Sequence, residues 1–311
     1  MYRYILKRIL MVIPVLLGVI IVVQGIMELN PADPVYQIVG ESATEEQIEA
    51  AREEYGLNDP FVVRLGRYIW NFCHGDLGTS YTTRESVMKT YWSQLPATIE
   101  LAVVAVVVGL LLSQPLGIHA ATHQNSLTDS SCMIFSLIGV SMPGFWSGLL
   151  LMLLFALYLG WLPSAGNDHW YSVILPGLTQ GFYMTGFMTR STRSAMLETV
   201  RSDYMTTALA KGVNRKKAVM KHAYKNAQIP IVTAAGVQFA HIIGGSVTVE
   251  KLFSWPGVGR ALVTAITSRD IPVVTGYITM TAVLICLVNL LIDIIYAFID
   301  PRIKAQYSGK R

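Results

Sequence analysis

The stretch LAVVAVVVGLLLSQPLGI, residues 101–118, contains no Asp, Glu, Lys or Arg. A hydrocarbon core about 30 Å thick requires a helix of about 20 mostly apolar residues, because only a helix satisfies its own backbone hydrogen bonds in lipid. Five further stretches are free of charged residues over a comparable length. The six stretches predict six transmembrane helices, at residues 9–27, 101–118, 132–162, 171–189, 226–249 and 271–292.

Two of these stretches need a further argument. The first follows Arg3, Lys7 and Arg8, as the apolar part of a signal peptide would, but it ends without a small-residue cleavage pattern, which favours a retained anchor. The fourth is short and interrupted by a proline and three glycines, so we expect it to be tilted, bent or buried among its neighbours. The interrupting residues are Pro176, Gly177, Gly181 and Gly186.

The composition agrees with a membrane location. The chain has 311 residues, of which 52% are hydrophobic and only 14% are charged, whereas about 25% charge is usual in a soluble domain. The missing polar surface excludes an ordinary soluble protein of this length. The three cysteines, Cys73, Cys132 and Cys286, form no CxxC pair, so we expect neither a structural disulfide nor a bound metal.

The distribution of Lys and Arg predicts the orientation. Six spans place both termini on one side of the membrane. The amino-terminal end, the loop after the fourth span and the carboxyl-terminal end carry 3, 9 and 4 basic residues, whereas the opposite side has only Lys251, Arg260 and Arg269 outside its one long loop. Because basic segments stay in the cytoplasm, both termini are predicted to be cytoplasmic.

The long loop between the first two spans, residues 29–94, is predicted to be a large extracytoplasmic domain. Residues 28–93 contain 11 acidic and 5 basic residues. Within them TEEQIEAAREEYG, residues 44–56, predicts a helix with Thr44 as its N-cap, Gln47 completing a capping box and Gly56 ending it. We expect this acidic helix to be a solvated surface.

The longest predicted cytoplasmic segment is RSTRSAMLETVRSDYMTTALAKGVNRKKAVMKHAYKNAQIP, residues 190–230, which is too polar to span a membrane. A short helix is predicted over residues 204–211. Gly212 then permits a left-handed turn, and Asn214 can cap a second, basic helix over residues 215–228. The second helix leads through Pro230 into the fifth span. The unit is therefore predicted to be a helix, a glycine turn and a helix attached directly to the membrane.

This segment resembles the cytoplasmic EAA loop of ABC-importer permeases. Residues 206–208, Thr-Thr-Ala, stand in the EAA place, and Gly212 follows after three further residues. In that family the short helix sits in a cleft of the ATP-hydrolysing subunit and transmits its closure. The resemblance implies this coupling role for Tyr204, Thr206, Thr207, Ala208, Ala210, Lys211 and Gly212. The sequence departs from the family pattern at Thr206, where a glutamate is expected.

A second segment, EKLFSWPGVG at residues 250–259, resembles a stretch outside the membrane in peptide/nickel permeases. The matching residues, implied to form an extracytoplasmic gate or turn, are Glu250, Phe253, Trp255, Pro256, Gly257 and Gly259. The glycines and the proline predict a tight turn, and Trp255 is expected at the level of the lipid headgroups. With GVSMPGFW at residues 139–146, these matches make the chain similar to the dipeptide, oligopeptide and nickel branch over nearly its whole length.

The resemblance implies an all-α integral membrane protein of six transmembrane helices, with the type I ABC importer permease (MetI-like) architecture and a large extracytoplasmic loop between helices 1 and 2. The implied parts are a cytoplasmic tip and first span at 1–28, the extracytoplasmic domain at 29–94, a permease core at 95–299 with a coupling loop at 190–229, and a cytoplasmic tail at 300–311. The implied location is the bacterial cytoplasmic (inner) membrane.

Energy must come from partners, because no GxxxxGK[ST] phosphate-binding loop occurs in the sequence. The chain is therefore predicted to be no enzyme and to bind no cofactor of its own. The resemblance implies a second homologous permease subunit, two ATP-binding subunits that hold ATP and Mg, and an extracytoplasmic substrate-binding protein, with no nucleic acid.

The sequence leaves the substrate open. Peptides are favoured by the breadth of the family, with nickel, a metal chelate or glutathione as alternatives. An ion-coupled secondary carrier is the alternative of another class, and it would need an ionisable mid-membrane site, whereas Glu100 and Asp293 lie near span ends. Polar residues that could line a substrate path, or simply join helices, are Ser136, Ser141, Thr179, Gln180, Gln238 and Ser246.

Overall fold

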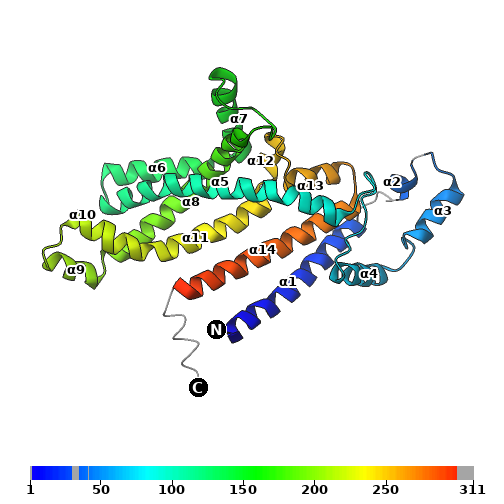
Figure 1. Cartoon of the computed structure of the whole chain (residues 1–311), viewed down its shortest axis with the longest axis horizontal. Coiled ribbons are helices and arrows are strands. Elements are labelled where there is room, and N and C mark those ends of the chain that lie inside the picture. The colour runs from blue at the N-terminus through cyan, green and yellow to red at the C-terminus, as the bar shows by residue number, and fades with distance from the viewer. Residues whose placement is uncertain (1, 30–34, 41, 300–311) are drawn as a thin grey trace. The chain divides into compact units, whose positions relative to one another are not determined.

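The computed structural model describes residues 2–29, 35–40 and 42–299, and all its regular elements there are helices (Figure 1). In chain order they are α1 Tyr2–Glu28, α2 Val35–Val39, α3 Glu45–Glu54, α4 Phe61–Cys73, α5 Val87–Thr122, α6 Leu127–Ser141, α7 Gly144–Met152, η1 Leu153–Tyr158, η2 Trp170–Val173, α8 Ile174–Val200, α9 Asp203–Ala210, α10 Arg215–Ala218, η3 Val219–Ala223, α11 Tyr224–Gly245, α12 Val247–Leu252, α13 Val258–Thr267 and α14 Ile271–Ile299. The predicted all-α class is confirmed for this part of the chain, and the predicted tail at 300–311 lies outside it.

Four helices are long and apolar enough to cross a membrane. They are Arg8–Glu28 in α1, Val87–Thr122, the continuous helix Arg215–Gly245 that α10, η3 and α11 form together, and Ile271–Ile295 in α14. These contain most of the first, second, fifth and sixth predicted spans. A bent pair, Leu127–Ser141 with Gly144–Tyr158, makes a fifth candidate if it is counted as one span. The described helices are therefore those of a multi-pass membrane protein.

The third predicted span is not one helix, so the prediction of a single helix over residues 132–162 was wrong. The chain bends by 99° between Leu127–Ser141 and Gly144–Tyr158. Met142 at the bend is extended, with φ −80° and ψ 128°, because the ring of Pro143 disfavours a helical conformation in the residue before it. The broken helix then restarts at Gly144, where the Ser147 amide donates to the Pro143 carbonyl at 3.1 Å.

The fourth predicted span corresponds to α8, which is buried as expected. This helix is not among the candidate spans, because its sequence carries many polar and small residues. Fourteen of its 27 residues are buried in the structure. Helices α6, α7 and α11 pack against it. A polar helix is tolerated here because protein covers it rather than lipid.

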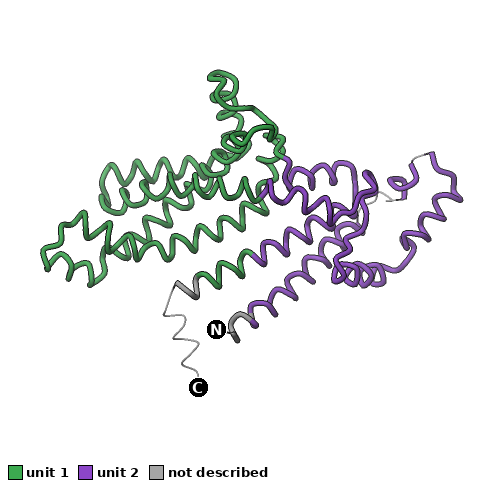
Figure 2. Tube along the Cα trace, viewed as in Figure 1, with its two compact units in different colours: residues 1, 99–255, 288–311 green, residues 2–98, 256–287 purple. Residues whose placement is uncertain are grey.

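The described chain divides into two compact units, shown in different colours in Figure 2. Unit 1 comprises Ile99–Trp255 and the chain from Val288 onward, and unit 2 comprises Tyr2–Thr98 and Pro256–Leu287. In unit 1, α6 and α8 approach closely at Gly186. A Cβ at Gly186 would lie 2.2 Å from Val140 Cγ2 and 2.4 Å from the Ser136 carbonyl oxygen. The Ser136 hydroxyl donates to the Gly186 carbonyl at 2.7 Å, so this residue joins two helices, one of the two roles that the sequence left open for it.

Unit 2 is organised around the buried carboxylate of Asp270, which is 2% exposed. The Ser80 hydroxyl donates to it at 2.5 Å, and the amides of Tyr81 and Thr82 each donate at 3.2 Å. These three bonds fasten the loop before α5 to the start of α14. Further along the same helix, the Tyr277 hydroxyl donates to Gln94 Oε1 at 2.9 Å.

The loop between α1 and α5 contains three short helices, α2, α3 and α4. The capping box predicted for α3 is confirmed. The Gln47 amide donates to Thr44 Oγ1 at 3.4 Å, and the Thr44 amide donates to Gln47 Oε1 at 3.1 Å. Gly56, predicted to end the helix, has φ +61°.

We expect Gly186→Ala to destabilise the protein by about 1–3 kcal/mol, because the new methyl group meets the backbone of α6 and neither helix can yield locally. Thermal unfolding in detergent measures the effect. The matched control is Gly144→Ala, since a Cβ at Gly144 has nothing within 4 Å. Equal unfolding temperatures for the two variants would show that the α6–α8 contact does not require a glycine at position 186.

Candidate coupling site

Helix α9 and the turn after it form the glycine hinge that the sequence predicts. Gly212 has φ +82°, a conformation that costs other residues about 1–2 kcal/mol. The Gly212 amide donates to the Leu209 carbonyl at 2.9 Å, and the Val213 amide donates to the Ala208 carbonyl at 3.2 Å. This pair of bonds is the Schellman motif that ends a helix at a left-handed residue. Asn214 then caps the next helix, as predicted. Its Oδ1 accepts the Lys216 amide at 2.9 Å.

One face of α9 packs against the rest of unit 1, and the opposite face is exposed. Met205 is only 2% exposed, whereas Tyr204 and Leu209 are 40% and 43% exposed. Thr206, Thr207 and Ala210 are also exposed, and Ala208 is half-buried. The exposed side chains between Tyr204 and Ala210 are mostly small, so another protein can approach the helix backbone closely. Lys211 and Gly212 are exposed at its end.

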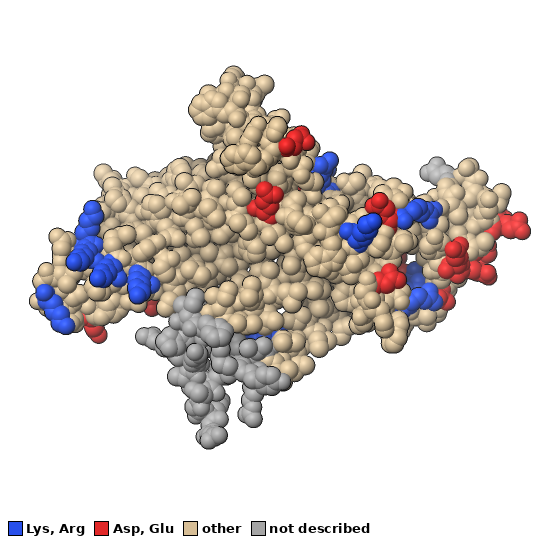
Figure 3. All heavy atoms as spheres, in the orientation of Figure 1, with Lys and Arg blue, Asp and Glu red and all other residues tan. Residues whose placement is uncertain are grey.

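The second helix of the hairpin continues without a break into α11. Its four-residue start, α10, passes through the π-helical segment η3 into the apolar helix, giving one helix over Arg215–Gly245. Ala218 and Ala223 are completely buried on its inner side. On the visible face of unit 1, basic side chains gather over the end with α9 and α10 (Figure 3). The helix that follows the Gly212 turn therefore runs without a break into an apolar helix.

A largely buried ion pair fixes α8, the helix that precedes the α9–α10 hairpin, to α6. Arg193 Nε donates to Asp129 Oδ1 at 2.8 Å, and Arg193 Nη2 donates to Asp129 Oδ2 at 2.7 Å. Asp129 is only 5% exposed, and its Oδ2 also accepts the Asn125 amide at 3.0 Å. Two parallel bonds to one carboxylate fix orientation as well as distance. Eight residues beyond Arg193, Arg201 Nη2 donates to Gln124 Oε1 at 2.8 Å.

Sequence reasoning missed this ion pair. It counted Arg193 only as one positive charge among nine in a basic loop and gave Asp129 no role. The two residues are 64 positions apart, so no local spacing joins them. The one available signal was Asp129 itself, because it is the only Asp, Glu, Lys or Arg in the connector at residues 119–131 and lies beside an apolar stretch.

The segment at residues 250–259 differs in part from its prediction. Trp255 is only 2% exposed, so protein covers its ring, and its predicted depth at headgroup level stays a prediction. The left-handed residue is Ser254, with φ +51°, whereas Gly257 is extended, with φ −92°, and caps α13. Gly259 lies inside α13, which follows Pro256 and Gly257, so the predicted glycine turn was wrong.

The remaining residues of that segment are fixed within their own units. In unit 1, Glu250 is completely buried and accepts the Ser246 hydroxyl at 2.7 Å. The Phe253 carbonyl in the same unit accepts the Gly166 amide at 2.9 Å. In unit 2, the Val258 amide donates to Thr98 Oγ1 at 2.9 Å. These hydrogen bonds hold the backbone and side chains of residues 250–259 in fixed positions within each unit.

The residues predicted to line a substrate path have different environments. Ser246 is buried against Glu250, and Thr179 donates to the Leu175 carbonyl in its own helix at 2.8 Å. Gln180 is 8% exposed on α8, Gln238 is half-buried on α11, and Ser141 is exposed at the end of α6. A path through these residues therefore stays a prediction.

Two solved structures share the fold. An inward-facing MetNI methionine ABC transporter chain superimposes with a TM-score of 0.56 at 17% identity, covering 68% of this chain and 97% of that one. A chain of an amino acid ABC transporter solved with histidines gives a TM-score of 0.51 at 15% identity, covering 69% and 94%. The fold is thus that of an ABC-transporter permease.

Sequence relatives narrow the class. The chain is 40% identical to the dipeptide transport system permease protein DppB of Alkalihalophilus pseudofirmus, over 98% of this chain and 100% of that protein. It is also 40% identical to the glutathione transport system permease protein GsiC of Salmonella paratyphi A, over 98% and 99%. Residues 113–305 match the binding-protein-dependent transport system inner membrane component, and residues 1–102 match the amino-terminal region of such components. The chain belongs to this family of ABC-importer permease subunits.

We expect Asp129→Ala to destabilise the protein by about 3–5 kcal/mol, because Arg193 is then left largely buried without its partner. Replacing both residues together, as Asp129→Leu with Arg193→Met, removes the stranded charge and is expected to recover most of the loss. Thermal unfolding of the two single variants and the double variant measures the coupling. Additive losses in the double variant would show that the two side chains act independently.

Proposed function

We propose that this chain forms half of the translocation pathway of an ATP-driven importer of peptides. The observation that carries the proposal is 40% identity over 98% of the chain to a dipeptide permease. Matches to glutathione and peptide permeases of the same extent support a small peptide as cargo. Nickel or a metal chelate is the alternative cargo for the same machinery.

In the proposed mechanism, the hairpin of α9 and α10 docks into an ATP-binding subunit. The free face of α9 supports this assignment, because it is exposed while Met205 holds the opposite face to the body of unit 1. Closure of the ATP-binding subunits moves α9, and the Gly212 turn and the continuous helix Arg215–Gly245 carry the movement to an apolar helix. Alternating access then results from movement of helices.

The proposed topology has six spans and both termini in the cytoplasm of a bacterium. It counts the four apolar helices, the bent pair α6 and α7 with η1, and the buried helix α8. Nine Lys or Arg residues between 190 and 229 support a cytoplasmic hairpin. The segment at 29–94 is then extracytoplasmic, the core lies at 95–299, and the tail begins at residue 300.

The proposed complex contains a second homologous permease, two ATP-binding subunits and an extracytoplasmic binding protein. ATP and Mg belong to the partners in this scheme, and the chain has no cofactor of its own. An ion-coupled carrier is less favoured, because the buried carboxylates of Asp129, Glu250 and Asp270 all accept hydrogen bonds within the described chain.

Transport by the reconstituted complex tests this proposal. Proteoliposomes containing both permeases, the ATP-binding subunits and the binding protein are expected to accumulate labelled di- or tripeptides only when ATP is present. Nickel and glutathione are offered in parallel to identify the cargo. Uptake by the isolated chain, driven by an ion gradient without ATP, would refute the assignment.

We expect Gly212→Val to reduce ATP-dependent uptake at least tenfold while membrane insertion stays normal. A β-branched residue strains the left-handed turn that ends α9, although a Cβ there meets no neighbour within 4 Å. Gly212→Asn is the matched control, because asparagine tolerates this conformation best after glycine. Co-purification of the ATP-binding subunits is measured beside uptake. Wild-type uptake and co-purification in the valine variant would remove the coupling role from this turn.

A further inference from the structure

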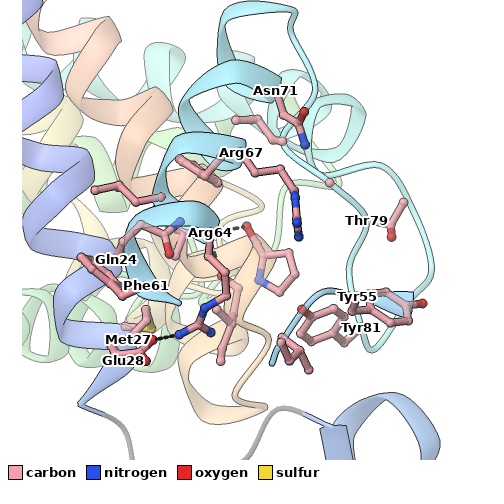
Figure 4. A pocket seen from close by; sticks show the side chains of 18 of the residues that line it. Gln24, Met27, Glu28, Tyr55, Phe61, Arg64, Arg67, Asn71, Thr79 and Tyr81 are labelled. Atoms are coloured by element: carbon pink, nitrogen blue, oxygen red, sulfur yellow. Dashed lines mark hydrogen bonds and ion pairs between the residues drawn. The ribbon is translucent and has the colours of Figure 1, made fainter. Parts of the chain in front are cut away.

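Helix α4 has two contrasting faces, although it belongs to a segment that the sequence predicts to be soluble. One face carries Phe61, Arg64, Leu65, Tyr68 and Asn71, which line a hollow of about 560 Å³ within unit 2. Figure 4 shows Arg64, Arg67 and Asn71 on α4 beside this hollow, with Tyr55 and Tyr81 at its edge. Burial raises the pKa of Tyr81 to about 12, which reflects how little water reaches this phenol at the edge of the hollow. The charged side chains of α4, with Tyr68 and Asn71, therefore lie on this face.

The same face fastens α4 alongside two apolar helices. Arg64 pairs with Glu28, the last residue of the candidate span in α1 (Figure 4). The Tyr68 hydroxyl donates to Thr279 Oγ1 at 3.2 Å, and Thr279 lies eight residues inside α14, which begins at Ile271. At about 1.5 Å per residue, Thr279 is about 12 Å along that helix. Helix α4 therefore lies beside the ends of two membrane helices, not beyond them.

The opposite face of α4 is apolar and uncovered. Val62 is 75% exposed, Val63 is 49% exposed and Trp70 is 67% exposed. Gly66 and Cys73 are exposed between and beyond them. No Asp, Glu, Lys or Arg belongs to this set. The nearest charge, Arg67, forms an ion pair with Asp59 at the edge of the helix. None of the 13 residues of α4 is buried.

We propose that this apolar face of α4 lies in the lipid bilayer, as an interfacial helix in the leaflet next to residues 29–94. At 13 residues, or about 20 Å, the helix is too short to span a core of about 30 Å. Amphipathic helices with tryptophan and valine on one side and charged residues on the other bind at this depth. Helix α4 packs against α1, and α1 also has exposed apolar residues near this end, with Val22 and Ile26 58% and 56% exposed.

Lipid fits this face better than water or a charged protein surface. Contact of the apolar Val62, Val63 and Trp70 side chains with water is unfavourable, whereas contact with lipid chains is not. Trp70 can place its ring among lipid headgroups, where tryptophan is common. Helix α3 is different, because six of its ten residues are Glu or Arg. The segment between α1 and α5 thus has a solvated part, α3, and a lipid-bound part, α4. The choice of leaflet is the one element of this proposal that rests on the proposed function.

Site-directed spin labelling measures the depth of α4 in the assembled transporter. The background variant carries Cys73→Ser, Cys132→Ser and Cys286→Ser, and a single nitroxide is attached after Val62→Cys or Trp70→Cys. The control position is Glu46→Cys, on the exposed face of α3. Power saturation in proteoliposomes compares collision with oxygen, which concentrates in lipid, and with a water-soluble nickel chelate.

We expect the ratio of oxygen to nickel collision to be at least threefold higher at positions 62 and 70 than at position 46. The same ratios are expected for the isolated chain in liposomes, where no partner is present. Ratios at positions 62 and 70 equal to that at position 46 would overturn the proposal. A label that is lipid-exposed in the isolated chain but immobilised and shielded from oxygen in the complex would also overturn it, because a protein partner would then cover the face. Neither readout depends on transport, so failure here is distinguishable from failure of the proposed function.

Discussion

The close approach of α6 and α8 in unit 1 is the constraint on which the placement of the α9–α10 hairpin depends. A glycine at position 186 lets the two backbones meet, and the Ser136 hydroxyl closes the contact at 2.7 Å. In lipid no hydrophobic force drives helices together, so close packing and interhelical hydrogen bonds must hold them. Helix α8 can carry polar and small residues only because this packing shields it from the bilayer.

The ion pair between Asp129 and Arg193 extends the same contact toward the hairpin. It lies between the glycine contact at residue 186 and the start of α9 at residue 203. A guanidinium bound by both nitrogens to one carboxylate resists rotation as well as separation. The end of α8 is therefore rigidly placed, and the Gly212 turn with φ +82° is a point where the chain reverses direction. The hairpin thus joins one helix fixed to α6 with another that continues into a candidate span.

Much of the fold follows from local sequence. The four apolar helices, the capping box at Thr44, the left-handed turn at Gly212 and the cap at Asn214 all depend on residues close together in the chain, and each was predicted. The errors have a different origin. A single span was predicted over residues 132–162 because hydropathy ignores the restriction that Pro143 imposes on Met142. Trp255 was expected to contact lipid headgroups because tryptophan is common there, whereas protein covers its side chain.

The sequence by itself determined the membrane environment, the helical class and the hairpin, because uncharged stretches and turn residues act through their own backbone and through the solvent around them. Only the tertiary structure decided which polar residues meet. The pairing of Asp129 with Arg193, of Asp270 with Ser80 and of Tyr68 with Thr279 joins residues that are 64, 190 and 211 positions apart. Such pairings depend on how the helices pack against one another, and the spacing of residues along the chain does not show which helices will pack together.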